Sequence, residues 1–456
     1  MKTIKIACVA LLFSMLFVPR LLVSQESLLL HAMREVPQAG WANPAYIPPC
    51  KAHFSFLIPG LVVSAGHSGF AWDDLFTRRA DDSLSLDISK AISKMKANNY
   101  LNSTFRLEAF SLGIKFGKNY LSLSSNVRTD VAFQYPKRLF ELLDQGNAPF
   151  IGQEMDFDKL HFNGTAWVEN SICYTRQISS KFNAGLRFKV LTGLANVHLA
   201  ENQLDFYTDD DMYDLSFESD FLVNTSYPTE ADYYMPQSRG YAIDFGITWT
   251  PVEELVVAAA VNDLGSITWK ENLVNYKSND NSVFTFSGLE LNDFFNSDDE
   301  IESGFEALAD SLEDIFSIQE LSNNYTSPLP TAYHLAANYR FTDYDQLGAV
   351  FNVRQFENQF IPSASLMYHH NFGRVFATTL AVSYHNQSFN NVGLGCSLNL
   401  GFLQIYALSG NVLSVIIPES ARNIGVQFGL NFLIGRLDKY KPPLTIIIEE
   451  DFWDEE

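Results

Sequence analysis

Apolar and polar side chains alternate along many segments of this chain. In residues 423–434 the even positions are bulky and apolar, whereas the residues between them are small or polar. Successive side chains of a β-strand point to opposite faces, so this pattern predicts a strand with one apolar and one polar face. The same period recurs in four other clear segments: 110–116, 241–249, 333–341 and 392–400.

The alternation divides the chain into about 14 strands of about ten residues, a length that crosses a bilayer when the strand is tilted. The predicted strands are 54–65, 106–116, 119–135, 163–176, 182–198, 239–250, 254–269, 331–341, 346–356, 362–371, 375–387, 391–400, 403–409 and 423–434. One join is ambiguous because the pattern changes phase at Gly401 without a clear turn sequence. Residues 391–409 are therefore either two strands or one bent strand.

The links between the predicted strands fall into two classes. Short links lie at 117–119, 177–181, 251–253, 342–345 and 371–374, and long ones at 66–105, 136–162, 199–238 and 270–330. Outer-membrane barrels have short periplasmic turns and longer extracellular loops, and with an even number of strands both chain ends lie on the periplasmic side. The sequence therefore predicts an all-β fold, a transmembrane antiparallel β-barrel in the cell outer membrane.

A water-soluble β-sandwich would also show alternation and is the main alternative. In a soluble sheet the polar face is solvated and rich in Lys and Glu, and turns recur at even spacing. Here the polar face carries mainly Gly, Ser and Asn with scattered charges. This composition favours the barrel.

The two ends of the chain differ from the strand region. Lys2 and Lys5 precede an apolar run over 6–18 and then Ser24, which is typical of a secretory signal peptide at residues 1–24. The predicted barrel covers 50–435, and the acidic segment 436–456 is expected to form a periplasmic tail.

Charge and cysteine content narrow the possible functions. The chain has 31 basic and 53 acidic residues, which argues against nucleic acid as a partner because phosphate binding needs a basic surface. Beyond the signal segment only Cys50, Cys173 and Cys396 remain, an odd and widely spaced set that does not predict a disulfide framework. Acidic residues gather in a few stretches that indicate solvated loops or tails.

Two of the long loops contain helical patterns. Apolar residues recur at helical spacing in 303–322 and again in 83–98, which predicts helical extracellular loops. Each helix would either form a lid or docking surface, or pack on the rim of its own barrel, and the second interpretation is the simpler one.

Short motifs resemble a known family. The segments Val36-Pro37-Gln38, Asn43-Pro44-Ala45, 240–246 and 261–269 together resemble an uncharacterised family of Bacteroidota outer-membrane barrels, with a likeness over about residues 26–436. That family is similar to the long-chain fatty-acid transporter barrels and, more loosely, to the accessory barrels of the type IX secretion system.

This resemblance implies that residues 25–49 fold into the barrel lumen as a plug. The residues that we assign to the plug interactions are Arg34, Glu35, Gln38, Asn43 and Pro44. No residue set matches a known fatty-acid site, so the resemblance does not imply a particular ligand for this chain.

Strand parity predicts which charged residues face the lumen. They are Lys115, Arg187, Lys189, Asp244, Arg340 and Arg354. A charge on the lipid face costs about 2–4 kcal/mol at the bilayer midplane, so these side chains should turn inward. They would either form a selectivity ring for anionic solutes or pair with one another and with the plug, for instance with Arg34 or Glu35.

Catalytic and metal-binding patterns are weak. His369 and His370 are adjacent on a strand and point to opposite faces, and no familiar nucleophile, phosphate-binding or metal-ligand spacing is present. The acidic run Asp209–Asp211 with Asp214 is either a calcium site or, more simply, a solvated hairpin tip. We therefore predict no enzyme activity, no metal and no cofactor.

Two functions follow from these patterns. The first is passive uptake or binding of a small hydrophobic or amphipathic solute; the alternative is a scaffold barrel that holds partner proteins at the outer membrane, related to type IX secretion. The expected partners are outer-membrane lipid, the barrel-assembly machinery and a periplasmic or surface protein.

Overall fold

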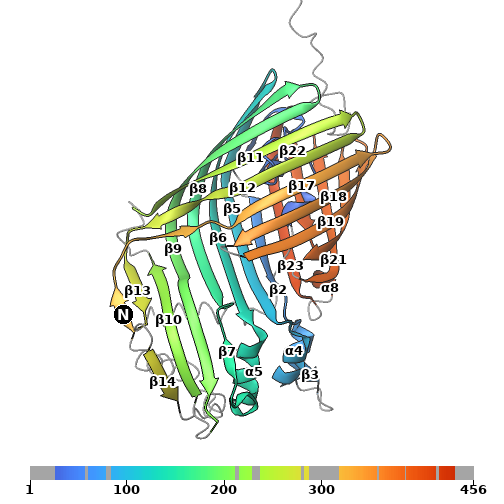
Figure 1. The fold of residues 1–456 in the computed structure, drawn as a ribbon. Coiled ribbons are helices and arrows are strands. Elements are labelled where there is room, and N and C mark those ends of the chain that lie inside the picture. The colour runs from blue at the N-terminus through green and yellow to red at the C-terminus, as the bar shows by residue number, and fades with distance from the viewer. Residues whose placement is uncertain are drawn as a thin grey trace, which may run out of the picture.

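The chain folds into a β-barrel with a sheet that extends beyond one of its ends (Figure 1). The computed structural model describes residues 26–56, 60–78, 84–210, 215–227, 237–278, 282–286, 318–356, 359–385, 387–416 and 421–436. Within these ranges no helix has the length and apolar character needed to cross a bilayer. The predicted signal peptide lies outside the described residues, as does the predicted tail beyond Arg436.

Fourteen antiparallel strands close the barrel, which confirms the predicted fold class and strand number. In order around the barrel they are β1 (Cys50–Ser55) continued by β2 (Gly60–His67), β5 (Asn98–Phe116), β6 (Asn119–Pro136), β8 (His161–Ser179), β9 (Phe182–Thr208), β11 (Arg239–Val252), β12 (Leu255–Trp269), β17 (Thr331–Arg340), β18 (Asp345–Phe356), β19 (Gln359–Phe372), β20 (Phe376–His385), β21 (Ser388–Leu400), β22 (Leu403–Ser409) and β23 (Asn423–Arg436). β1 and β2 together form the first strand, because both pair with β5 on one side and with β23 on the other.

The remaining elements lie in the connections and in the lumen. The other strands are β3 (Phe76–Arg78), β4 (Leu84–Leu86), β7 (Glu154–Asp156), β10 (Leu215–Ser226), β13 (Leu273–Lys277), β14 (Ser282–Phe286), β15 (Gln319–Leu321) and β16 (Tyr325–Pro328). The helices are α2 (Glu26–Leu29), η1 (Pro37–Trp41), α3 (Trp72–Leu75), α4 (Ile88–Lys94), α5 (Lys137–Gln145), η2 (Ala148–Phe150) and α8 (Leu413–Ile416).

The barrel is apolar outside and polar inside. On β5 the outward side chains Phe110, Leu112, Ile114 and Phe116 are each 44–50% exposed, whereas Ser111 between them is buried. The same alternation runs along the other barrel strands. Such an outer surface suits hydrocarbon, and closure leaves no unpaired strand edge in it.

The ambiguous join at Gly401 is a turn between two strands. Leu400 pairs with Leu403, and Gly401 has a φ of 69°, a left-handed conformation that glycine adopts without steric cost. β21 and β22 are therefore two strands joined by a tight turn, and the interpretation as one bent strand is wrong.

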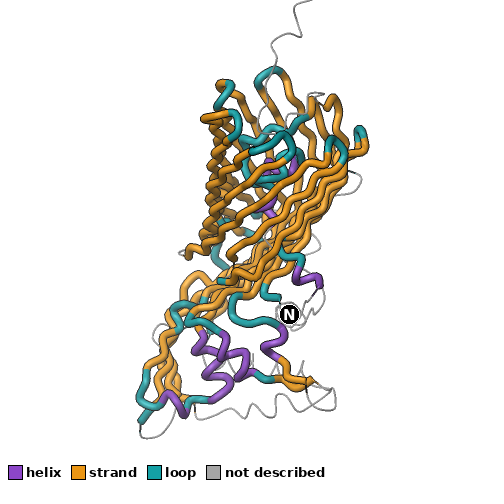
Figure 2. The backbone as a smooth tube through the Cα atoms, turned by 90° about the vertical axis from the view of Figure 1, so that its right-hand side faces the viewer, coloured by secondary structure: helices purple, strands orange, loops and turns teal. Residues whose placement is uncertain are grey.

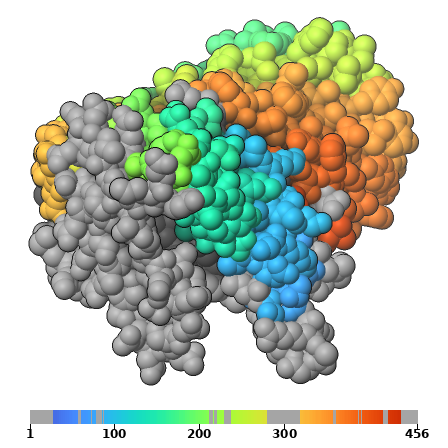
Figure 3. Space-filling model, turned by 60° about the horizontal axis from the view of Figure 1, so that its bottom comes forward, coloured from blue at the N-terminus to red at the C-terminus, as the bar shows by residue number. Residues whose placement is uncertain are grey.

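At the end opposite the short turns the sheet continues past the barrel (Figures 1 and 2). The distal half of β9, from Asn196 to Thr208, pairs with β10, which in turn pairs with β13 and β14. We call this part, together with β7 and β15, the extension. Figure 3 brings this end forward and shows the teal and green surfaces of residues near 150–220 beside the blue surface of β5 and its neighbours.

The helical loops were predicted only in part. In 83–98 the structure has α4, whose Ile92 packs with Met95 against Tyr135 of β6, so this helix lies on the barrel rim. Of the predicted helix 303–322 only residues 318–322 are described, and there the strand β15 pairs with β13, which contradicts helix at these positions. Cross-strand hydrogen bonding overrides the helical spacing there. The rest of that segment lies outside the described residues.

Residues 28–47 lie inside the barrel and are almost completely buried (Figure 2). Leu29, Met33 and Val36 are at 0% exposure and join a core cluster with wall residues such as Met367 and Leu408. We call residues 26–49 the luminal segment. It fills the middle of the barrel much as a core fills a soluble protein.

Within the part of the chain that the structure describes, fourteen hydrogen bonds among nitrogen and oxygen atoms join the luminal segment to the wall. At about 1 kcal/mol for each bond, this set alone is worth on the order of 10 kcal/mol. Burial of the apolar cluster adds to it. Spontaneous departure of the whole segment from the lumen is therefore very rare.

Two glycines of the wall make room for the luminal segment. A Cβ on Gly246 would lie 2.0 Å from Asn43 Oδ1, and one on Gly185 would lie 2.1 Å from the carbonyl oxygen of Pro44. The Asn43 amide in turn donates to the carbonyls of Ile247 and Ala259, both at 3.2 Å. The segment is thus seated in a notch of β9 and β11.

We predict that Gly246→Val loosens the luminal segment without opening the barrel. The valine would occupy the position of the Asn43 amide, at an overpacking cost of about 1–3 kcal/mol. Hydrogen exchange measured by mass spectrometry should become faster in residues 26–49 and stay unchanged in β17 to β21. Ile243→Val, on the outward face of the same strand, is the matched control; equal exchange in both variants would contradict the notch.

Candidate functional site in the barrel lumen

Charged side chains from seven neighbouring or facing strands meet inside the barrel. We call them the luminal charge cluster, and its members are Arg106, Arg128, Asp130, Glu169, Arg187, Lys189, Asp244, Asp263 and Arg354. They come from the inward faces of β5, β6, β8, β9, β11, β12 and β18. Strand alternation sends them inward because the outward face contacts lipid.

Arg128 lies at the centre of the cluster. Its guanidinium donates to Glu169 and to Asp263, each at 2.9 Å, and to Asp130 at 3.1 Å. The guanidinium carbon lies 4.7 Å from the centroid of the Trp167 ring, a cation–π arrangement. Three carboxylates and one aromatic ring thus hold a single buried cation.

Lys189 and Arg187 extend the cluster toward the luminal segment. The Lys189 ammonium lies 2.5 Å from the Asp263 carboxylate and 2.8 Å from that of Asp244. Arg187 donates to Asp244 at 3.1 Å and to the carbonyl oxygen of Gly40 at 2.7 Å. Through this last bond the cluster contacts η1 directly.

Asp263 reaches the lumen through a bulge in β12. Its φ is 61°, and its N–H donates to Asp244 Oδ1 at 2.7 Å. The pairing of β11 with β12 shifts register between Ile243 and Phe245. The bulge turns inward a side chain that simple alternation would place against lipid.

Arg106 differs from the other cations of the cluster. Arg354 donates to Asp130 at 2.6 Å, whereas Arg106 has no ion pair or hydrogen bond within the described residues and lies 4.7 Å from the centroid of the Trp41 ring. Among the five cations of the cluster, Arg106 is the one without a direct carboxylate partner among the described residues.

A cavity of about 190 Å³ lies beside the cluster, on the side of the luminal segment that faces the extension. We call it the upper cavity, although the end of the barrel that bears the extension points down in Figure 1. Its lining includes five cations of the cluster but only two carboxylates, those of Asp130 and Asp263. Apolar side chains lie between these charges: Val62 pairs across the sheet with Arg106, and Ala332 and Ile361 both pair with Arg354. The lining of the cavity therefore mixes cationic and apolar side chains.

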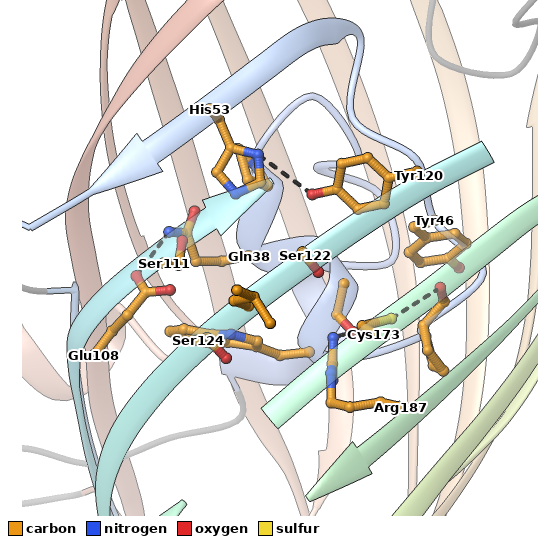
Figure 4. Close-up of a pocket in the computed structure, with 15 residues that line it drawn as sticks. Gln38, Tyr46, His53, Glu108, Ser111, Tyr120, Ser122, Ser124, Cys173 and Arg187 are labelled. Atoms are coloured by element: carbon orange, nitrogen blue, oxygen red, sulfur yellow. Dashed lines mark hydrogen bonds between the residues drawn. The ribbon is translucent and has the colours of Figure 1, made fainter. Parts of the chain in front are cut away.

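A smaller cavity of about 30 Å³, the lower cavity, lies between η1 and strands β5, β6 and β8 (Figure 4). Gln38 donates to Glu108 at 2.9 Å on one side of it. On another side the Tyr120 hydroxyl and His53 Nδ1 are 3.3 Å apart. This cavity is polar and lies nearer to the short turns.

The structure brings together four of the six predicted luminal charges: Arg187, Lys189, Asp244 and Arg354. Lys115 and Arg340 do not join them. Both lie near the short-turn end, where Arg340 donates to the carbonyl of Glu253 at 3.5 Å. The expected pairing of luminal charges with Arg34 or Glu35 is also wrong, because Arg34 lies over the ring of Tyr46 and Glu35 accepts from Ser397. Gly40 and Trp41 take that role because η1 lies closest to the cluster.

Among the assigned residues of the luminal segment, Gln38 makes the most hydrogen bonds with the wall. Gln38 bonds both Glu108 and Asn431, and Asn43 bonds two strand carbonyls. The carbonyl of Pro44 accepts from the Thr175 hydroxyl at 2.5 Å. The polar pairs thus fix the position of the segment.

Sequence reasoning missed Arg106, Arg128, Asp130, Glu169 and Asp263. Arg128, Asp130 and Glu169 lie on the polar face of their strands, so strand parity contained the signal for them. Arg106 and Asp263 could not be found in this way, because bulges in β5 and β12 reverse their direction.

One group outside the lumen has the composition of a cation site. Asp156, Asp158 and Asp205 on the extension place carboxylate oxygens within 4.8 Å of one another. Exposed acidic groups of this kind are common without a metal ion, so we assign it no role. Of the acidic run at 209–214, only Asp209 and Asp210 lie among the described residues, directly after β9.

Solved structures with a similar fold include transport channels. A monoaromatic hydrocarbon channel, the TodX deltaS2S3 mutant, has a TM-score of 0.45 and 10% identity and covers 88% of this chain and 94% of its own. The toluene transporter TodX of Pseudomonas putida has a TM-score of 0.40 and 10% identity, covering 87% and 91%. A FadL homologue of Pseudomonas aeruginosa has a TM-score of 0.35 and 10% identity, covering 87% and 93%.

Sequence comparison gives a family but no function. No curated protein matches the chain. The profile of one family matches residues 44–410, which is most of the sequence and nearly the whole barrel. The chain therefore belongs to the family of unknown function DUF5723.

Proposed function

We propose that this protein is an outer-membrane barrel for the passive uptake of a small amphipathic solute, and that the solute binds in the upper cavity with an anionic group toward Arg106. The observation that carries the proposal is the mixed cationic and apolar lining of that cavity. A ligand site of this kind combines apolar walls with a few placed polar groups.

The outer surface of the barrel supports a location in an outer membrane. Aromatic and aliphatic side chains cover it, with Trp249 and Tyr339 near the short-turn end. Short turns at one end and long connections at the other match the asymmetry of outer-membrane barrels, whose short turns are periplasmic. The upper cavity then opens from the extracellular side of the luminal segment.

The charges favour an anionic ligand group. Each carboxylate of the cluster already has a cationic partner, whereas Arg106 has none within the described residues. A guanidinium facing a cavity binds carboxylates, sulfates and phosphates in a bidentate manner. The apolar side chains of the lining would accept the hydrocarbon part of the same molecule.

The pairing within the cluster also favours binding over catalysis. A general base needs a carboxylate or imidazole that is free to take a proton. Here Asp130, Glu169, Asp244 and Asp263 are all neutralised by arginine or lysine. These ion pairs stabilise the charged form of the four carboxylates.

A scaffold barrel related to type IX secretion was the alternative. The comparisons give no support to it, nor to an origin in Bacteroidota, and both stay predictions. The same holds for the expected barrel-assembly and protein partners. No contact in the described residues favours the scaffold over uptake.

We predict that Arg106→Gln weakens the binding of decyl sulfate to the protein in lipid nanodiscs by about tenfold, because one charge-assisted contact is lost. Binding of decanol, which has the same chain without the charge, should change by less than about twofold. Calorimetric titration of both ligands measures the difference.

Arg340→Gln is the control for this experiment, since Arg340 lies near the short-turn end, away from the upper cavity. If Arg106→Gln and Arg340→Gln weaken the binding of decyl sulfate equally, the sulfate group does not bind at Arg106. If neither ligand binds the natural protein, the proposed function fails.

We predict that deletion of residues 26–49 opens the barrel to ions. The luminal segment fills the middle of the lumen, so its loss would leave a continuous polar channel between the cluster and the short-turn end. Planar-bilayer recordings should give a steady conductance for the deletion variant and little for the intact chain. Equal conductance of the two would show that the segment does not occlude the lumen.

A further inference from the structure

The upper and lower cavities are separated by very little protein. Two side chains, Trp41 and Arg187, line both of them. The lower cavity extends to Tyr120, which is two residues from the turn at Lys118. The lower cavity therefore lies between the level of Trp41 and the short-turn end of the barrel.

The two separating side chains are held very differently. Arg187 is fixed at both ends of its guanidinium, by Asp244 and by the carbonyl of Gly40. The Trp41 indole has no hydrogen-bond partner within the described residues, is only partly buried and packs at the edge of the core cluster. The guanidinium of Arg106 lies over the face of the Trp41 ring, 4.7 Å from its centroid, and stabilises the ring in this position.

The backbone around Trp41 is nevertheless anchored. Asn262 donates to the carbonyl of Trp41 at 3.2 Å and to that of Ala42 at 3.0 Å. A fixed backbone with a loosely held ring allows rotation of the side chain about its own bonds.

We propose that the indole of Trp41 is a movable septum between the two cavities, so that a solute passes along η1 while the luminal segment stays in place. The proposal deepens the proposed function and rests on it for the identity of the solute. Rotation of the ring joins the cavities into one passage that runs from the cluster to Tyr120.

The strength of the contacts decides which part moves. Release of the whole luminal segment would break fourteen hydrogen bonds and expose its apolar cluster. Rotation of the ring loses one cation–π contact and some packing. The ring therefore opens far more often than the segment leaves.

Arg106 couples the septum to the ligand site. The same guanidinium contacts the Trp41 ring and lines the upper cavity. An anionic group bound there would attract the guanidinium toward the cavity and away from the ring face. Ligand binding would thus loosen the septum.

The first experiment compares three substitutions at Trp41 in the full chain, reconstituted in planar bilayers with potassium chloride. Conductance should rise severalfold in Trp41→Ala, less in Trp41→Leu, and stay near the natural level in Trp41→Phe, because a smaller side chain leaves a wider gap. Heat-modifiable migration on gels confirms that each variant has folded. Equal conductance of all folded variants would overturn the proposal.

A second experiment tests whether the luminal segment stays seated. A Cβ on Gly246 would lie 2.9 Å from Asn43 Cγ, close to the separation of about 3 Å between a Cβ and the distant sulfur of a disulfide. The pair Asn43→Cys and Gly246→Cys can therefore staple the segment to the wall, with Cys50, Cys173 and Cys396 replaced by serine.

In the stapled background, Trp41→Ala should keep its raised conductance under oxidising conditions, and reduction should change it little. If oxidation abolishes the rise, the segment and not the ring is what moves, and the septum is refuted. These readouts use ions alone. A failure of decyl sulfate to bind would therefore contradict the proposed function, but it would not show whether Trp41 separates the two cavities.

Discussion

Closure of a hydrogen-bonded sheet against hydrocarbon determines the rest of this structure. In lipid no water is present to pair with an open strand edge, so the first strand must pair with the last, as β1 and β2 do with β23. Closure in turn sends every second side chain into a narrow lumen. Since charges cannot turn outward, they gather inside and must be neutralised there.

The inward-facing side chains form two kinds of interior in the lumen. Around Met33 and Val36 it is packed with apolar side chains, like the core of a soluble protein. Around Arg128 it contains paired charges with almost complete mutual satisfaction, which buried ions need in order to be tolerated. The upper cavity borders on both, and this explains why cationic and apolar side chains line it together.

Much of this arrangement could be predicted from the sequence, and the failures have physical causes. Period-two alternation reports which face contacts lipid, so it located the fourteen barrel strands and the inward direction of Arg187 and Asp244. It has no information about which inward charges meet, because that depends on the register between strands. Asp263 and Arg106 were missed because bulges in β12 and β5 break the period. The strand at β15 was missed because its pairing with β13 joins residues about 45 positions apart, a contact that no local pattern encodes.

β9 is much longer than the part of a strand that crosses a bilayer. The strand has 27 residues, and at about 3.3 Å per residue its path is roughly 90 Å long. Crossing the hydrocarbon uses about ten of those residues. The remainder projects beyond the bilayer. In the orientation that we propose, a molecule that approaches from outside the cell therefore meets the distal edge of this strand before it reaches the mouth of the barrel.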